Sequence, residues 1–169
     1  MVFSSISFVY YFLPITLLLY FIVPNKFKNF ILLLASLLFY FYGEPRYIII
    51  LIFSCIFNYY AGKLLEKQTK KTRKLILIID IIVNFGTLFY FKYFNFFLEN
   101  INYIFNTNFN LLNITMPIGI SFFTFQASSY VIDIYNKKIK SSSSLFNFAT
   151  YLSLFPQLIA GPIVRYETI

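Results

Sequence analysis

Residues 75–91 read LILIIDIIVNFGTLFYF, a run of 17 residues in which Asp80 is the single charged side chain. A helix that crosses the hydrocarbon core of a bilayer needs about 20 mostly apolar residues, with a range of about 17–25. The run lies between Lys74 and Lys92, whose long side chains can reach the headgroups from just inside the membrane. The stretch therefore predicts a membrane-spanning helix.

The composition of the whole chain also indicates a membrane protein. Of its 169 residues, 59% are apolar and 12% are charged, whereas soluble domains have about 45–50% apolar and about 25% charged residues. A chain of this size has too much surface for its volume to hide that apolar excess in one core. The composition thus excludes a soluble globular domain, and the high apolar content excludes a disordered chain.

Five apolar segments are predicted to span the membrane, and a sixth is broken. Pro156 cuts the sixth after 11 residues, which makes it a re-entrant or interfacial segment or a kinked helix. We expect an all-α, polytopic transmembrane fold. Residues 1–169 are expected to form one membrane-embedded domain with no soluble domain, and the first segment is not expected to be a cleaved signal peptide. The six segments are residues 6–23, 30–42, 47–61, 75–91, 116–135 and 145–160.

The basic residues predict how the chain is oriented. If every segment crosses, the loops after the first, third and fifth segments share one side and hold eleven of the 14 basic residues. Cytoplasmic loops are enriched in Lys and Arg, so we expect these loops in the cytoplasm and the N-terminus outside the cell (inner) membrane. The net charge of +8 is scattered over short loops, which argues against nucleic-acid binding.

The residue inventory limits the chemistry of these 169 residues. The chain has no His and one Cys. This excludes an imidazole base, a Ser–His or Cys–His nucleophile pair, an internal disulfide and a zinc cluster. We therefore expect no metal and no bound cofactor.

The polar side chains considered as candidates lie inside two of the predicted spans. Asp80 and Asn84 share a helical face, and Asp80 either lines an internal cavity or pairs with Arg73 or Lys74. The fifth segment carries two polar stripes, which allow it either to line a substrate cavity or to pack closely against other helices through small hydroxyl residues. In the second stripe, Asp133 can also pair with Lys137. The stripes consist of Ser121, Thr124 and Ser128, and of Gln126, Tyr130 and Asp133.

Two proline-containing pairs, Pro156–Gln157 and Gly161–Pro162, mark a break in the sixth segment. Backbone groups freed in a membrane must be satisfied by protein or by a water-filled cavity. The break is therefore either a turn at a substrate passage, with Arg165 available to an anionic group, or the place where the chain leaves the bilayer. The candidates for lining a substrate passage are Gln126, Tyr130, Asp133, Pro156, Gln157, Gly161, Pro162 and Arg165.

Between the fourth and fifth segments the apolar residues recur at helical spacing. Phe97, Ile101, Ile104 and Phe105 stand at i, i+4, i+7 and i+8 in a stretch rich in Asn. This pattern predicts a short amphipathic helix on the outer surface of the membrane.

Three strings of the sequence are similar to one family. The chain resembles bacterial membrane-bound O-acyltransferases of the alginate O-acetyltransferase branch, with the D-alanyl transfer protein of teichoic acid modification further off. The resemblance covers the whole chain, in order. The strings are LSLFPQLIAGPIVRY at 152–166, PIGISFFTFQ at 117–126 followed by Tyr130, Asp133 and Tyr135, and YGEPRY at 42–47 together with MVFSS at 1–5.

The resemblance implies the N-terminal portion of a larger, many-helix acyltransferase. Such enzymes move an acyl group, here with a bias to acetyl, from acetyl-CoA or another acyl carrier to hydroxyls of an exported polysaccharide such as alginate or of another envelope polymer. The implied partners are the lipid bilayer, that acceptor and other proteins of a polymer-acylation system. The essential His of the family lies in its later half, so we expect it beyond residue 169 and expect the chain alone to be inactive. The alternatives are a transporter or channel component and a non-catalytic membrane scaffold.

Overall fold

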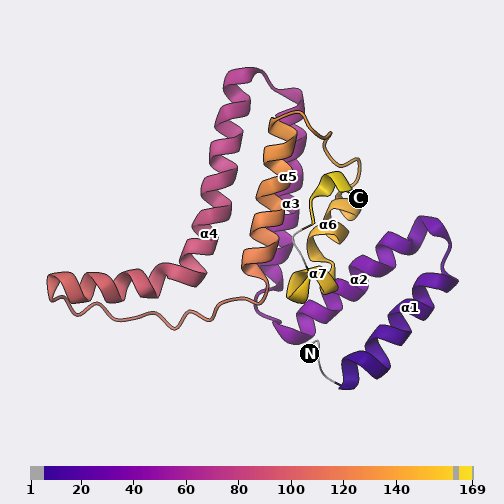
Figure 1. The fold of residues 1–169 in the computed structure, drawn as a ribbon, viewed down its shortest axis with the longest axis horizontal. Coiled ribbons are helices and arrows are strands. Elements are labelled where there is room, and N and C mark those ends of the chain that lie inside the picture. Colours follow the sequence, from indigo (N-terminus) through magenta and orange to yellow (C-terminus); the bar gives the residue numbers. More distant parts are fainter. Residues whose placement is uncertain (1–5, 162–163, 169) are drawn as a thin grey trace.

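The computed structural model describes residues 6–161 and 164–168, and these residues are helical with no strand. In the described residues, seven α-helices and two short helical turns of other types follow one another (Figure 1). A π-helical turn, η1 (Phe8–Phe12), leads into the first helix, and a 3₁₀ turn, η2 (Tyr166–Thr168), ends the described chain. The helices are α1 (Leu13–Ile22), α2 (Asn25–Gly43), α3 (Ile48–Lys67), α4 (Lys70–Phe105), α5 (Ile120–Tyr135), α6 (Leu145–Ser153) and α7 (Phe155–Ala160).

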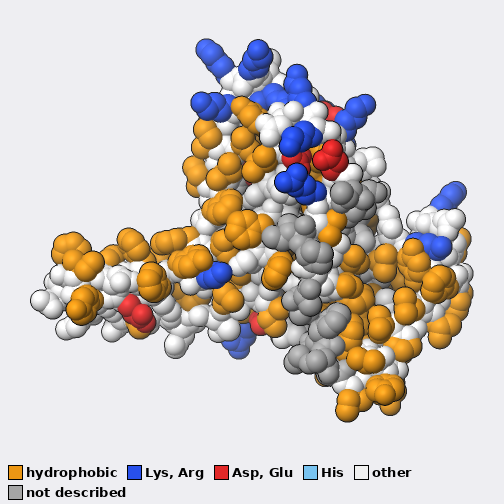
Figure 2. Space-filling model, in the orientation of Figure 1, with side chains coloured by type: hydrophobic (Ala, Val, Ile, Leu, Met, Phe, Trp, Pro, Cys, Tyr) orange, Lys and Arg blue, Asp and Glu red, His pale blue; other side chains and the backbone are white. Residues whose placement is uncertain are grey.

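All six predicted apolar segments are largely helical, but α4 extends well beyond the predicted 75–91, and the sixth segment forms two helices, α6 and α7. By length and composition, two described helices are apolar enough to cross a membrane, α3 and α4, and the apolar stretch Phe8–Ile22 is shorter. Hydrophobic side chains cover much of the visible surface (Figure 2), as expected where lipid replaces water. The all-helical fold is thus confirmed, whereas the count of five spans stays a prediction.

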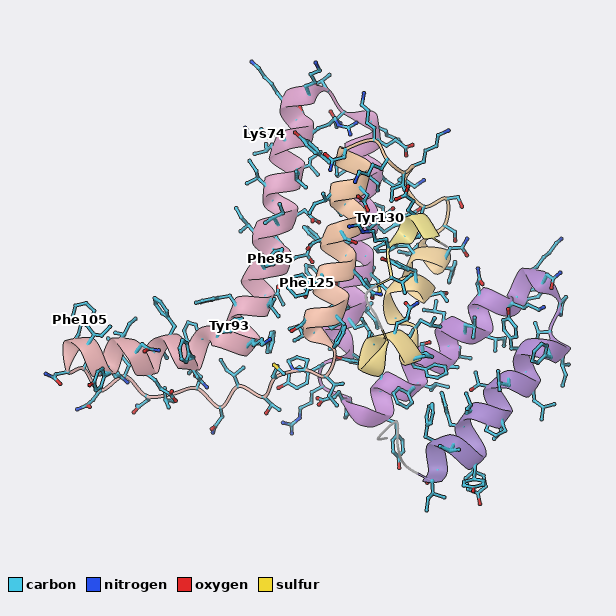
Figure 3. The ribbon with its side chains drawn as sticks, viewed as in Figure 1. Lys74, Phe85, Tyr93, Phe105, Phe125 and Tyr130 are labelled. Atoms are coloured by element: carbon cyan, nitrogen blue, oxygen red, sulfur yellow. The ribbon has the colours of Figure 1, made fainter. Side chains whose placement is uncertain are left out.

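Helix α5 lies at the centre of the fold, between α4 on one side and α6 and α7 on the other, with α3 packed behind it (Figure 1). Its residues Ala127, Tyr130 and Val131 are fully buried, as are Leu51 and Leu65 of α3. Across the α4–α5 contact, Phe85 and Phe125 meet edge to face with ring centroids 5.7 Å apart (Figure 3). The surface of α5 that faces α3 and α4 is therefore used for helix packing.

Helices α1 and α2 form a hairpin that contacts the rest of the fold through the packing of α2 on α6 and through a small aromatic core. Phe8, Phe39 and Phe155 are buried together, and their ring centroids lie 5.3–5.7 Å apart. Aromatic pairs at such distances add about 0.5–1.5 kcal/mol beyond the area they bury. This core links the hairpin to α7, so the N-terminal segments help to position the broken C-terminal one.

Helix α4 has 36 residues and bends sideways beside Tyr93 (Figures 1 and 3). The amphipathic helix expected around Phe97–Phe105 is not separate but is the last part of α4, a difference the sequence pattern could not show because no Pro or Gly marks the bend. We call residues 93–105 the arm. Asn106 ends the arm in the left-handed conformation, with φ 50°, which Asn tolerates better than most residues.

The chain returns along the arm through residues 106–119, which we call the return loop. Two asparagines of the arm hold the loop backbone: the Asn95 amide nitrogen donates to the carbonyl of Leu112 at 2.7 Å, and its amide oxygen accepts the Leu112 N–H at 3.1 Å. Asn102 makes the same pair of bonds to Phe109, both at 2.9 Å. Each side-chain amide thus pairs with the loop backbone as a neighbouring β-strand would. The N–H and C=O groups of Leu112 and Phe109 are therefore hydrogen-bonded.

Candidate functional site

The candidate site lies where the second polar stripe of α5 faces α7. Gln126 is almost completely buried, and its amide nitrogen donates to the side-chain oxygen of Gln157 on α7 over a long 3.4 Å. The oxygen of the Gln126 amide has no hydrogen-bond partner among the described residues. A buried carbonyl oxygen without a partner is uncommon in native proteins, which makes this pair of glutamines a place where a further polar group can be bound.

The backbone break that brings Gln157 to α5 lies at Leu154, two residues before the predicted one. Leu154 leaves helical geometry (φ −54°, ψ 114°), and Pro156 then sits in the first turn of α7, where its missing N–H is not needed. The freed N–H of Phe155 donates to the buried hydroxyl of Ser36 on α2 at 3.3 Å. The break is thus satisfied by protein, as a membrane requires.

Gly119, at the start of α5, allows α7 to pack closely against it. Its φ of 75° is in the left-handed region, and a Cβ added there would lie 2.7 Å from the carbonyl oxygen of Leu158. Glycine meets both demands because it has no Cβ. The contact positions α7, and with it Gln157, against α5.

Tyr130 is fully buried where α5 meets α3, α6 and the C-terminal turn (Figure 3). Its hydroxyl accepts the backbone N–H of Ser142 at 2.9 Å, and its ring lies 4.4 Å from Phe148 and 5.0 Å from Tyr166, measured between centroids. A Cβ at Gly62 of α3 would lie 2.8 Å from the Tyr130 ring. Tyr130 therefore ties four parts of the chain together.

Asp133 lies one turn further along the same stripe, at the end of α5 that carries the basic residues. It is buried and lies 3.8 Å from the Lys138 ammonium group, not from Lys137 as predicted. The prediction was wrong because Lys137 takes a left-handed conformation (φ 60°), and the chain then folds back so that the Lys138 N–H donates to the Asp133 carbonyl. An ideal helix, assumed in the prediction, does not contain this turn.

The remaining candidates are spread along the C-terminal turn. Pro156 and Arg165 are exposed, Gly161 is half-buried, and Pro162 lies outside the described residues. The Tyr151 hydroxyl on α6 donates to the carbonyl of Val164 at 2.8 Å, which holds this turn against the bundle. The structure thus brings together Gln126 and Gln157, buries Tyr130 and Asp133 further along α5, and leaves Pro156 and Arg165 at the surface.

A second polar cluster joins α3 to α4, the two helices that are long and apolar enough to cross a membrane. The side-chain amides of Asn58 and Asn84 donate to each other at 3.2 and 2.9 Å, and both residues are buried. Neither carboxylate oxygen of the fully buried Asp80 has a hydrogen-bond partner among the described residues. Arg73 instead donates to the carbonyls of Ile134 and Tyr135 at 2.9 and 2.8 Å. The predicted pairing of Asp80 with Arg73 or Lys74 was therefore wrong.

The sequence interpretation missed Asn58 as the partner of Asn84. The available signal was a single amide in an otherwise apolar segment, four residues after Ser54, where a buried polar group requires a partner. Ser54 and Asn84 also line a small cavity of about 10 Å³ together with Thr87 and Thr124. Among the described residues no group of His, Cys, Asp or Glu could hold a metal ion.

Comparison with known proteins identifies relatives over almost the whole chain. No family model matches it, and no solved structure matches it. It is 37% identical to the probable alginate O-acetylase AlgI of Pseudomonas aeruginosa and 35% identical to that of Azotobacter vinelandii. It is also 35% identical to the peptidoglycan O-acetyltransferase of Helicobacter pylori.

Each of these alignments covers 99% of the chain but only 33%, 35% and 37% of the respective relative. The chain therefore spans about a third of the length of the curated relatives that it matches. The resemblance predicted from the three sequence strings is confirmed, since these relatives are O-acetyltransferases of the membrane-bound type.

Proposed function

We propose that this chain is part of a membrane-bound O-acyltransferase that transfers an acetyl group to hydroxyls of an exported polysaccharide or another cell-envelope polymer. The observation that carries the proposal is the similarity along 99% of the chain to an alginate O-acetylase and a peptidoglycan O-acetyltransferase. In this proposal acetyl-CoA or another acyl carrier supplies the acetyl group, and other proteins of the polymer-acylation system are the partners. The chain contributes membrane helices and part of the substrate passage.

Within this function, we assign the Gln126–Gln157 pair to the wall of the passage. Both side chains offer amide groups to the polar atoms of an acyl ester, and the oxygen of Gln126 is not used within the described chain. Tyr130 and Asp133 continue the same stripe of α5 and are buried. The turn from Pro156 to Arg165 forms its rim, which is its most exposed part.

Substituting either glutamine tests this assignment. In the protein that the complete gene encodes, Gln126→Leu and Gln157→Leu should each lower polymer acetylation by about tenfold, the effect of losing one substrate hydrogen bond of about 1.4 kcal/mol. Acetate transfer from a labelled donor to de-acetylated polymer is measured in vesicles, with thermal unfolding to verify the fold. Asn113→Leu, an exposed position of the return loop, is the matched control. Unchanged acetylation in both glutamine variants would remove the pair from the passage.

The proton acceptor for the attacking hydroxyl is proposed to lie outside these residues. A hydroxyl acceptor needs a base near neutral pH, and the 169 residues contain no His. In the same assay the 169-residue chain alone should therefore show no turnover above empty vesicles. Turnover by the chain alone would contradict this proposal, and ion or sugar flux without acetyl transfer would favour a transporter.

We further propose the orientation that the loop charges predict, with the basic loops in the cytoplasm, the N-terminus outside and five spans. In support, the loop before α4 and the loop after α5 lie at the same end of the bundle, because Arg73 binds the last carbonyls of α5 and Ser141 donates to Glu66. Basic side chains gather at this end in Figure 2.

The arm is proposed to lie in the outer interface of the membrane. At the bend, Phe89 of the spanning part and Phe97 of the arm are in ring contact, with centroids 5.9 Å apart. The edge of the arm that carries Phe97 thus faces the side on which α4 enters the bilayer. Glu99 projects from the other edge, because two residues along a helix are about 200° apart. Ile104 shares the Phe97 edge and is 68% exposed.

Single tryptophans test this placement, since the chain has none of its own. In phosphatidylcholine vesicles, the indole of Ile104→Trp should lie about 5–10 Å deep and be quenched by lipids brominated on their acyl chains. Tyr103→Trp, one residue earlier and 86% exposed, should instead be quenched by iodide in solution. Because both probes sit on the same arm, mixed vesicle orientation affects them equally. Equal iodide quenching of the two variants would place the arm in water.

A further inference from the structure

The basic end of the bundle contains a hollow of about 460 Å³ between the α3–α4 connection and the end of α5. Three of its six lining residues are cationic, Lys70, Arg73 and Lys137, and none is acidic. The other three lining residues are Gln68, Thr69 and Tyr135. This volume is within the usual range for small-ligand sites, about 300–1,000 Å³.

Among the described residues, the positive charges around this hollow have no acidic partner. Among the described residues one ion pair is present, between Asp133 and Lys138, and neither of these residues lines the hollow. Glu66 is bonded to the hydroxyl of Ser141. Like charges that converge in this way repel one another, and an anion bound among them removes that cost.

Arg73 is already fixed in place at this site. One nitrogen of its guanidinium group donates to the carbonyls of Ile134 and Tyr135, and the group lies over the Tyr135 ring at 5.7 Å from its centroid. The guanidinium fork has five N–H groups, so donors remain for a ligand. A planar, anchored guanidinium suits the oxygens of a phosphate and loses little entropy when it binds them.

Lys70 and Lys137 add two exposed ammonium groups to the lining of the hollow. Lys70 is the first residue of α4, and Lys137 follows the end of α5 in a left-handed conformation. Both side chains are exposed, so they can move to a ligand. The hollow thus combines the anchored guanidinium group of Arg73 with the ammonium groups of Lys70 and Lys137. Guanidinium and ammonium groups are the usual donors to phosphate in proteins.

We propose that this hollow binds a phosphate group, carried either by the headgroup of an anionic lipid or by a soluble phosphorylated compound. The site is distinct from the Gln126–Gln157 pair, and the inference does not depend on the proposed acyl transfer. Its place at one end of the α3 and α4 spans puts it at the level of the headgroups, where an anionic leaflet supplies phosphates.

The test uses the chain in nanodiscs and measures the midpoint of thermal unfolding by circular dichroism. One arm compares phosphatidylcholine with a mixture that contains phosphatidylglycerol. The other arm keeps phosphatidylcholine alone and titrates inorganic pyrophosphate in solution. A ligand that binds only the folded protein raises the midpoint, so stabilisation in the first arm identifies lipid and stabilisation in the second identifies a soluble phosphate.

The double variant Lys70→Gln with Lys137→Gln should bind the effective ligand at least about tenfold more weakly, the effect of losing charge-assisted hydrogen bonds. Arg73 is left unchanged because it also holds the end of α5. The control is Lys26→Gln with Lys28→Gln, which removes the same charge from another loop. No stabilisation in either arm would overturn the proposal, as would equal losses in the two double variants, because the effect would then follow net charge alone.

Discussion

Replacing Gly119 with Ala should lower the free energy of unfolding by at least about 2 kcal/mol and separate α7 from α5. A left-handed conformation costs a residue with a Cβ about 1–2 kcal/mol. The new Cβ would also lie 2.7 Å from the Leu158 oxygen and 2.9 Å from its Cγ. The first of these atoms belongs to the backbone, so α7 itself must move. The Gln126–Gln157 contact should then be lost.

Thermal unfolding in detergent, followed by far-ultraviolet circular dichroism, measures this effect. The matched control is Gly86→Ala in α4, where an added Cβ has no atom within 4 Å. Since Ala favours a helix over Gly by about 1 kcal/mol, this control should be neutral or stabilising. Equal effects of the two substitutions would show that Gly119 does not position α7.

Replacing Asp80 with Leu should stabilise the protein, in contrast to Gly119→Ala, and raise the free energy of unfolding by about 2 kcal/mol. Asp80 is fully buried, and both of its carboxylate oxygens lack a hydrogen-bond partner among the described residues. A charged Asp at the centre of a spanning helix costs about 2.5–3.5 kcal/mol on insertion scales. Leu is larger than Asp but carries no charge, so it removes that cost.

Asp133→Leu is the comparison, because Asp133 is a buried carboxylate with an ion partner. Lys138 lies 3.8 Å from it with half of its side chain exposed, and such pairs are worth about 0–1 kcal/mol. Asp133→Leu should therefore give no gain and a small loss of stability. Chemical unfolding of both variants in the same detergent measures the difference. If Asp80→Leu is the less stable of the two, Asp80 has a stabilising partner.

The candidate site could be predicted in part from the sequence. The polar stripe of Gln126, Tyr130 and Asp133 was visible as helical spacing, and the break near Pro156 followed from the chemistry of proline. The contact between Gln126 and Gln157 was not visible, because the two residues are 31 positions apart and meet only once α7 packs on Gly119. Spacing assigns residues to a face but does not say what that face meets.

Long-range polar pairs in general depended on packing. Asn58 and Asn84 pair because α3 and α4 present them at the same height. Asp133 pairs with Lys138 and not with the predicted Lys137, because the left-handed conformation of Lys137 turns the chain at the end of α5. Arg73 binds the last carbonyls of α5 and not Asp80. Each outcome depends on the rotation and height of neighbouring helices, which local periodicity leaves open.

The sequence by itself determined that this is a helical membrane protein with six apolar segments, because apolar content and segment length respond directly to the hydrocarbon core of a bilayer. Only the tertiary structure decided where α4 bends, which polar side chains meet, and that three cations share a hollow without an acid. Those features depend on contacts between residues far apart in the chain. Such contacts form only when several helices pack at once.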